Sequence, residues 1–297
     1  MWALIVSLLA LQGAAATAPD DPIAREISRF KGVMAVSARN LLTGEEINID
    51  ADRRFPTAST IKTAVLLEAY AQAAAERIRL DRPVTLRAGD KVGGSGVLDG
   101  LHDGATLTVA DLLHLMIVVS DNTATNLLVE ILGTRNVDDR LVSLGFQETK
   151  LFRPTFRDGK PDVFPELEKE FGLGMTTPRE MAKLMALIAE GRAVNAETSA
   201  AMLKTLRGQQ DRAMIPRLLP ATVEVANKTG ADEEKHMAAD GTRHHVRADA
   251  AIVTGRNVKY VIAIYARDVR DTRWTIDNDA LTTGARISKM VFDRFTR

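Results

Sequence analysis

Three short motifs in this sequence have residue types and spacings that suit nucleophilic catalysis. They are Ser59-Thr-Ile-Lys62, Ser120-Asp-Asn122 and Lys228-Thr-Gly230. A serine followed one helical turn later by a lysine arises by chance about once in a chain of this length, and Ser28-Arg-Phe-Lys31 is such a match. All three motifs together, each at the end of a predicted helix or strand, are far harder to explain by chance. They predict one catalytic site.

The first motif has the properties of a nucleophile beside its own base. If a helix begins at Ser59, Lys62 lies on the same face one turn later, within reach of the serine Oγ. A lysine that is removed from water and placed near a second cation has a lowered pKa, so it can accept the proton of the serine. The helix N-terminus also favours negative charge on the attacking oxygen and offers the Ser59 backbone N–H to an oxyanion.

The other two motifs supply groups for the leaving group and for substrate binding. Ser120 lies in a predicted turn between two helices, where its hydroxyl could relay a proton to the leaving group. Lys228 and Thr229 end a predicted strand and offer a cation and a hydroxyl to a substrate carboxylate. Gly230 has no Cβ, so a substrate could pair along the edge of that strand.

The elements that must hold these motifs follow from apolar periodicity and from capping residues. Thr108 and the Thr-Pro pair at 177–178 are typical of helix starts, and Gly133 is typical of a helix end. A hairpin is expected at the Thr43-Gly44 turn. The sequence predicts helices over residues 21–30, 59–78, 109–119, 123–133, 176–191, 196–206 and 279–295, strands over 32–41, 45–50, 221–230, 247–255 and 259–268, and a long loop over 150–175.

This order of elements predicts an α/β (α+β) protein. Short turns between consecutive strands favour an antiparallel sheet, with the two terminal helices covering it. We expect one discontinuous sheet domain, residues 19–57 and 213–297, with an all-helical domain, residues 58–212, inserted into it. A cleft between the two domains is the expected position of the active site.

Composition restricts the classes of ligand. Among 297 residues, Lys plus Arg and Asp plus Glu both number 39, so the formal net charge is zero and we expect no nucleic-acid partner. The absence of cysteine excludes disulfides, thiol nucleophiles and thiolate metal sites. The five histidines have no spacing typical of a metal site, and the pair His244-His245 is expected to be solvated. We expect a monomer that needs no metal and no cofactor.

The N-terminus has the pattern of a secretory signal. An apolar run over residues 2–11 is followed by small residues at 15–18, although no Lys or Arg precedes the run. The run is too short to span a bilayer. We therefore expect residues 1–18 to be a signal peptide that is removed, and the mature chain to be periplasmic or secreted, with no membrane span.

The three motifs, together with the surroundings "MIVVSDNTATNLL" and "MTTPREMA", resemble the active-site set of class A β-lactamases and penicillin-binding proteins. The resemblance covers nearly the whole mature chain. It implies a five-stranded antiparallel sheet beside an inserted helical domain. It also implies acyl-enzyme chemistry on a small β-lactam or on the D-Ala-D-Ala amide of a cell-wall fragment.

The resemblance implies a catalytic role for four residues. Ser59 becomes the nucleophile, and Lys62 the base or proton shuttle of acylation. Ser120 becomes the proton relay, with Lys228 beside it.

The resemblance also implies a set of substrate contacts. Asn122 would contact the amide side chain of the substrate. Lys228 and Thr229 would bind its carboxylate at the edge of their strand, where Gly230 has no side chain. A second oxyanion N–H, next to that of Ser59, would belong to Ala231. Arg247 resembles the strand arginine that helps to hold the carboxylate.

One position departs from the family pattern. Class A β-lactamases hydrolyse the acyl-enzyme with a loop glutamate that activates water, helped by an asparagine. Here the loop has no asparagine, and the glutamate position falls on Thr155 when aligned on "TKLFR" or on Phe164 when aligned on "PEL". The nearby residues Glu166, Glu168 and Glu170 are expected on an exposed turn.

Three functions remain open from the sequence. The first is a secreted class A β-lactamase-type hydrolase that opens the β-lactam ring through an acyl-enzyme on Ser59. The second is a D-Ala-D-Ala carboxypeptidase or an esterase that releases β-lactams slowly. The third is a penicillin-binding sensor that is acylated once. Turnover separates the first from the third, and preference for a β-lactam over an acyl-D-Ala-D-Ala peptide separates the first from the second.

Overall fold

A computed structural model describes residues 21–297 of the chain, so the expected signal peptide lies outside the described residues. The centre of the fold is a five-stranded antiparallel sheet in the order β2–β1–β10–β9–β8, which confirms the predicted fold class. Its strands are β1 (Val33–Asn40), β2 (Glu46–Ile49), β8 (Glu224–Glu233), β9 (His245–Thr254) and β10 (Lys259–Val269).

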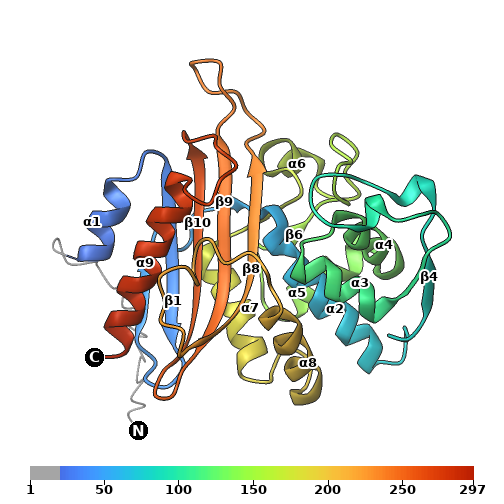
Figure 1. Cartoon of the computed structure of the whole chain (residues 1–297), viewed down its shortest axis with the longest axis horizontal. Coiled ribbons are helices and arrows are strands. Elements are labelled where there is room, and N and C mark those ends of the chain that lie inside the picture. Colours follow the sequence, from blue (N-terminus) through green and yellow to red (C-terminus); the bar gives the residue numbers. More distant parts are fainter. Residues whose placement is uncertain (1–20) are drawn as a thin grey trace, which may run out of the picture.

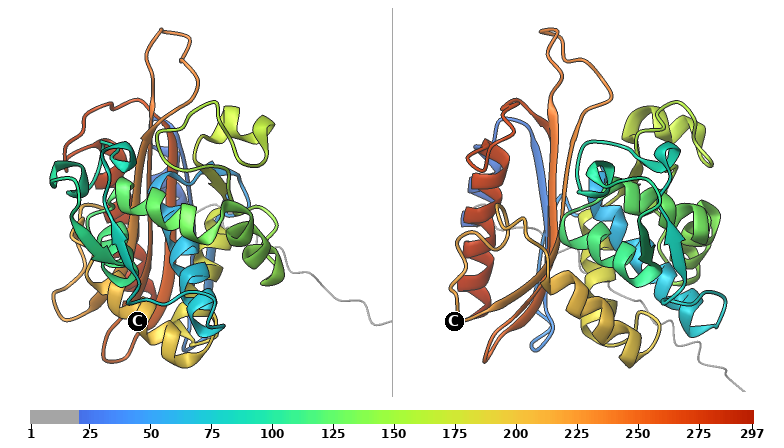
Figure 2. Two further views of the ribbon diagram at one scale, coloured as in Figure 1. Left: turned by 90° about the vertical axis from the view of Figure 1, so that its right-hand side faces the viewer. Right: turned by 45° about the vertical axis from the view of Figure 1, so that its right-hand side comes forward.

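Helices cover both faces of the sheet, as Figures 1 and 2 show. On one face lie the two terminal helices, α1 (Pro22–Ser28) and α9 (Asp279–Phe295). The buried side chains of α9 recur at helical spacing, with Ile287, Val291 and Phe295 on one stripe. That stripe packs on sheet residues such as Val36 and Ile262. The central strands β9 and β10 are therefore buried on both faces.

The opposite face carries the larger group of helices. They surround one apolar core that includes Val65, Leu112, Leu128 and Met185 and reaches the sheet at Ala250. The helices are α2 (Lys62–Ala74), α3 (Val109–Val118), α4 (Asn122–Leu132), α5 (Thr134–Ser143), α6 (Pro165–Phe171), α7 (Pro178–Ala189) and α8 (Ala196–Arg207), with short 3-10 turns η1 (Ala58–Ile61), η2 (Ala88–Asp90) and η3 (Leu98–Gly100).

Two small sheets complete this side of the fold. One has the order β3–β7–β6, and the other is the pair β4–β5. Their strands are β3 (Phe55–Pro56), β4 (Pro83–Thr85), β5 (Thr106–Thr108), β6 (Lys150–Leu151) and β7 (Gly174–Thr176). Within residues 21–297 no helix is both long enough and apolar enough to cross a membrane.

The predicted helix ends are confirmed by their hydrogen bonds. The side chain of Thr108 accepts the N–H of Asp111, whose carboxylate in turn accepts the N–H of Thr108, a reciprocal cap of α3. Thr177 caps α7 in front of Pro178. Gly133 ends α4 with a φ of 83°, which a residue without Cβ adopts easily.

The structure differs from the predicted elements in three regions of the helical side. The helix expected from Ser59 begins with the 3-10 turn η1 and ends at Ala74. Helix α5 was not predicted, because its sequence is polar and its buried apolar residues are only Val137 and Leu141. The expected loop over 150–175 contains β6, α6 and β7. The boundaries between the two expected domains stay a prediction.

Candidate active site

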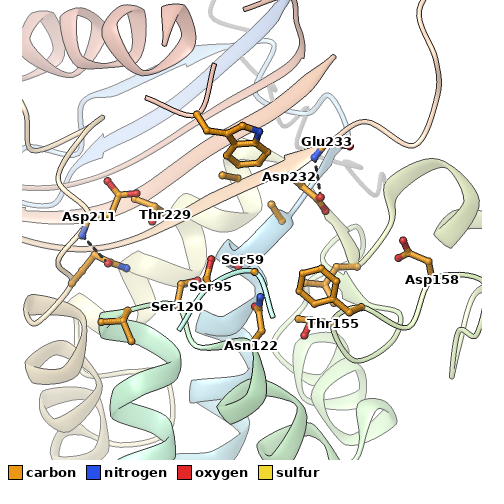
Figure 3. Close-up of a pocket in the computed structure, with 18 of the residues that line it drawn as sticks. Ser59, Ser95, Ser120, Asn122, Thr155, Asp158, Asp211, Thr229, Asp232 and Glu233 are labelled. Carbon is orange, nitrogen blue, oxygen red and sulfur yellow. Dashed lines mark hydrogen bonds between the residues drawn. The ribbon is translucent and has the colours of Figure 1, made fainter. Parts of the chain in front are cut away.

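A cavity of about 940 Å³ opens between the edge strand β8 and the helices on its side of the sheet. The helical side contributes Ser59, Ser120 and Asn122, and β8 contributes Thr229 and Ala231. Figure 3 shows Ser59 and Ser120 close together near the centre of this site. The structure thus brings parts of all three sequence motifs to one cavity.

The two motif lysines lie beneath the cavity wall, where neither side chain has contact with water. Nζ of Lys62 donates to the backbone O of Ser120 at 2.7 Å, to Ser120 Oγ at 3.1 Å and to Asn122 Oδ1 at 2.8 Å. Three donors therefore meet three acceptors, which matches an ammonium group. Within the described chain, Ser59 is not among these partners.

Ser120 stands between the two lysines. Its Oγ lies 3.1 Å from Nζ of Lys62 and 3.1 Å from Nζ of Lys228. Lys228 also donates to the backbone O of Thr229 at 2.8 Å. Because both lysines donate to Oγ, the hydroxyl hydrogen of Ser120 is left for a third partner in the cavity. This arrangement can pass a proton from either lysine, through Ser120, to a bound leaving group.

The burial of these cations sets their acidity. Burial, and next the positive charge of Lys228, lowers the pKa of Lys62 well below its ordinary value, and Asp121 opposes this. Burial lowers the pKa of Lys228 to about 8, against the charges of Asp211 and Asp249. A desolvated lysine next to another cation is a group that can lose its proton near neutral pH and act as a base.

Two residues at the start of the first two motifs have a strained backbone. Ala58, which precedes the serine of the first motif, has a φ of 42°, and Ser120 has a φ of 57°. For a residue with a Cβ, this left-handed conformation is less favourable than the right-handed one by about 1–2 kcal/mol. Both residues line the cavity. Unfavourable backbone conformations of this kind are often found at functional sites.

Gly230 has a packing role that the sequence did not reveal. A Cβ on this residue would stand 2.9 Å from the backbone O of Thr57 and 3.2 Å from Cβ of Ala58. Glycine thus lets β8 approach η1, the turn that carries Ser59. Gly230 is not part of the cavity wall, whereas its neighbours Thr229 and Ala231 are.

Asp121, the middle residue of the second motif, fixes the glycine-rich loop above the cavity. Its Oδ2 accepts the N–H groups of Val97 at 2.7 Å and Leu98 at 2.9 Å, while its Oδ1 accepts that of Ala124 at 2.8 Å and caps α4. A Cβ on Gly96 would stand 2.3 Å from Asp121 Oδ2. The loop therefore needs glycine at this point.

Arg247 lies behind the cavity wall. Its guanidinium stacks on the indole of Trp274, 4.2 Å from the ring centroid, and donates to the backbone O of Val246 at 2.9 Å. It also lies 2.9 Å from Nδ1 of His245. Trp274, not Arg247, forms the wall there. A direct contact between Arg247 and substrate stays a prediction.

The atypical loop places Thr155 in the cavity wall. Its N–H donates to Asn126 Oδ1 at 2.8 Å and its hydroxyl donates to the same oxygen at 3.0 Å. Phe164, the residue of the other alignment, lies outside this wall and packs its ring on that of Phe152, with centroids 6.0 Å apart. The alignment on "TKLFR" is therefore the one that agrees with the geometry, and it gives threonine in place of glutamate.

The three neighbouring glutamates stand outside the cavity wall. Glu166 is exposed and pairs with Lys169 at 3.0 Å. Glu170 is half-exposed and lies 3.5 Å from Arg267. The expectation of exposure was wrong for Glu168, which is buried and forms an ion pair with Arg153 at 2.9 Å. This ion pair joins the two ends of the loop segment 153–168.

Two aromatic wall residues, Phe156 and Trp274, were not singled out from the sequence. Both lie in irregular segments, where no periodicity marks a side chain as facing a cavity. Asp121 was visible within its motif but had no assigned role. Among the described residues, no cluster of His, Asp and Glu has the arrangement of a metal site.

Comparison with known proteins agrees with this geometry. Residues 18–295 match the Beta-lactamase enzyme family. A β-lactamase from Sphaerobacter thermophilus is 30% identical, with a TM-score of 0.78 over 92% of this chain and 97% of that one. PBP-A is 25% identical, with a TM-score of 0.77 over 92% and 94% of the two chains. A mutant of PBP-A is known as an acyl-enzyme complex with penicillin-G.

An ancestral class A β-lactamase gives a similar result, with 26% identity and a TM-score of 0.76 over 92% of this chain and 98% of that one. The match to the family extends over all three motifs and over the whole described fold. The chain belongs to the Beta-lactamase enzyme family, whose members are serine hydrolases of the β-lactamase and penicillin-binding type.

Proposed function

We propose that this protein is a secreted penicillin-binding-type hydrolase that is acylated on Ser59 and releases the acyl group slowly. Its substrates would be β-lactams and the acyl-D-Ala-D-Ala ends of cell-wall peptides. The observation that carries the proposal is Thr155, which lines the cavity and which takes the place of the family's water-activating glutamate when the loop is aligned on "TKLFR". The apolar run over residues 2–11 and the small residues at 15–18 support secretion with removal of residues 1–18.

Acylation would begin when Lys62 is neutral. Its free lone pair accepts the proton of Ser59, and the serine oxygen attacks the carbonyl carbon of the β-lactam or peptide bond. The backbone N–H groups of Ser59 and Ala231 would stabilise the oxyanion. The C–N bond then breaks as Ser120 gives its proton to the leaving nitrogen, and a neighbouring lysine restores that proton.

Substrate binding would use the β8 side of the cavity. The charge of Lys228 and the hydroxyl of Thr229 would hold the substrate carboxylate. On the opposite side, one Nδ2 hydrogen of Asn122 goes to the backbone O of Gly93 at 3.0 Å, and the other has no partner among residues 21–297. This hydrogen would bind the acyl side-chain carbonyl of the substrate.

Deacylation needs a base for water, and Thr155 is not one. Its hydroxyl donates to Asn126, and a threonine does not deprotonate near neutral pH. Asp158, a carboxylate of the same loop that also lines the cavity, lies farther from Ser59 than Thr155 does in Figure 3 and is paired with Arg153 and Lys235. The ester on Ser59 would therefore persist. The acyl-enzyme that a PBP-A mutant forms with penicillin-G supports the acylation step.

A fast β-lactamase is the second candidate, favoured by the relative that is 30% identical and is itself a β-lactamase. One experiment separates the two functions. Purified mature protein is mixed with a chromogenic cephalosporin, and hydrolysis and intact mass are followed together. We expect a lasting adduct that maps to Ser59 and is absent from Ser59→Ala. Sustained turnover with little adduct would instead establish the β-lactamase.

A further inference from the structure

Phe156 is a cavity residue that the proposed chemistry does not use. Among residues 21–297, seven residues other than glycine have a positive φ, and Ala58, Ser120 and Phe156 are the members of this set that line the cavity. Ala58 directly precedes the first motif, and Ser120 begins the second. Phe156, with a φ of 54°, holds a bulky side chain in the left-handed region, which is unfavourable for it.

Burial does not explain this strain. The residue is 62% exposed, so it contributes little to the core of the protein. A strained backbone that presents an exposed phenyl ring to a cavity is instead typical of a residue kept for a ligand.

The ring of Phe156 lies against the glycine-rich loop and beside Asn122. A Cβ on Gly94 would stand 2.5 Å from Cζ of Phe156 and 2.9 Å from Nδ2 of Asn122. The phenyl edge and the amide therefore meet over the same glycine. Gly94, with a φ of 88°, leaves the space that the ring fills. The ring thus joins the atypical loop to the opposite wall at the position of the Asn122 amide.

We propose that Phe156 determines specificity by forming the apolar wall of the subsite for the acyl side chain of the substrate. The inference rests on the proposed acylation of Ser59. A side chain whose amide carbonyl is bound by Asn122 would continue along the phenyl ring, so an aromatic or aliphatic group there would bury its surface against Phe156. A substrate that lacks this group would bury no surface against the ring, so its rate of acylation would not depend on Phe156.

Phe164 offers a matched control on the same loop. It is also a phenylalanine in the left-handed region, with a φ of 52°, and it is 41% exposed. Its ring packs on Phe152 and lies outside the cavity wall.

The test compares two penicillins that differ only in the acyl side chain. Penicillin G carries a phenylacetamido group, and 6-aminopenicillanic acid has a free amine there. Rate constants for acylation of Ser59 are measured by intact mass for the wild type, Phe156→Gly, Phe156→Leu and Phe164→Gly. For Phe156→Gly we expect about a tenfold loss with penicillin G and a change within about twofold with 6-aminopenicillanic acid.

The other variants and a melting curve define the remaining outcomes. Phe156→Leu should lie between the wild type and Phe156→Gly, and Phe164→Gly should acylate like the wild type. Phe156→Gly should melt no lower than the wild type, because glycine adopts this φ freely. A marked fall in melting temperature, an equal loss with both penicillins or no loss at all would overturn the inference. Failure of the wild type to be acylated by either penicillin would refute the proposed function itself.

Discussion

Thr155 and Asn126 are joined by three hydrogen bonds. The N–H and the hydroxyl of Thr155 both donate to Asn126 Oδ1, at 2.8 and 3.0 Å, and Asn126 Nδ2 donates to the backbone O of Thr155 at 3.2 Å. These bonds fix residue 155 in the cavity wall. They also use the threonine hydroxyl as a donor, so Thr155 itself offers no base to a water in the cavity.

A carboxylate at this position should restore deacylation. In Thr155→Glu the two bonds to the backbone of residue 155 can remain, while the new side chain supplies a general base, an effect worth about 100-fold or more when well placed. We expect the adduct with a cephalosporin to decay about 10- to 100-fold faster than in the wild type, followed by intact mass. Thr155→Gln, which has nearly the same shape and no base, should not accelerate decay. Equal decay in all three proteins would contradict the role given to residue 155.

Replacement of the buried base should slow acylation without loss of the fold. In Lys62→Met the proton acceptor is absent, so the acylation rate constant should fall by at least about 100-fold at pH 7. Non-covalent binding, measured by calorimetry with an acyl-D-Ala-D-Ala peptide, should persist. The melting temperature should not fall, because the substitution removes a buried cation whose pKa is lowered by burial. Acylation at the wild-type rate would show that another group takes the proton of Ser59.

The acylation rate constant should depend on pH through both lysines. Lys62 must be neutral to accept a proton, so the rate should rise with pH as this lysine, with its lowered pKa, loses its proton. Lys228 must be charged to attract the substrate carboxylate, so the rate should fall above its pKa of about 8. Stopped-flow measurement across pH 5 to 10 gives the profile. A β-lactam methyl ester, which has no carboxylate, should lack the alkaline fall. Retention of that fall would exclude Lys228 as its cause.

A buried carboxyl away from the cavity should make stability depend on pH. Burial raises the pKa of Asp138 to about 7, against a hydrogen bond from the N–H of Leu151 and the charge of Lys150. Its other oxygen, Oδ2, is buried without a partner in the described structure. Because the folded state keeps the proton that the unfolded state releases near pH 4, the free energy of unfolding should fall as pH rises from about 4 to 7, by about 4 kcal/mol.

Asp138→Asn should remove this dependence, since its amide oxygen can still accept the Leu151 N–H. Urea unfolding at pH 5 and pH 8 should give a smaller difference for this variant than for the wild type. The adjacent exposed Asp139→Asn is the control and should behave as the wild type. A variant that keeps the full difference would assign it to another carboxyl.

Local sequence was sufficient for most of the helices and strands. Thr108, Gly133 and Thr177 stand where the structure begins or ends a helix, because a cap or a left-handed turn depends on residues only a few positions away. Helix α5 escaped prediction because its stability comes from packing on distant residues and not from its own apolar pattern. The strands β6 and β7 escaped for a similar reason, since each is short and pairs across a long loop.

By itself the sequence determined the three motifs, their order and the absence of a glutamate in the expected register. Only the tertiary structure showed that Lys62 and Lys228 both donate to the hydroxyl of Ser120. It also showed that Thr155 is bound by Asn126 and that Glu168 forms an ion pair with Arg153. Only the structure placed the Phe156 ring over Gly94. Caps and periodicity are short-range properties, whereas burial and the contacts of residues far apart in the chain arise only when the sheet and the helices pack together.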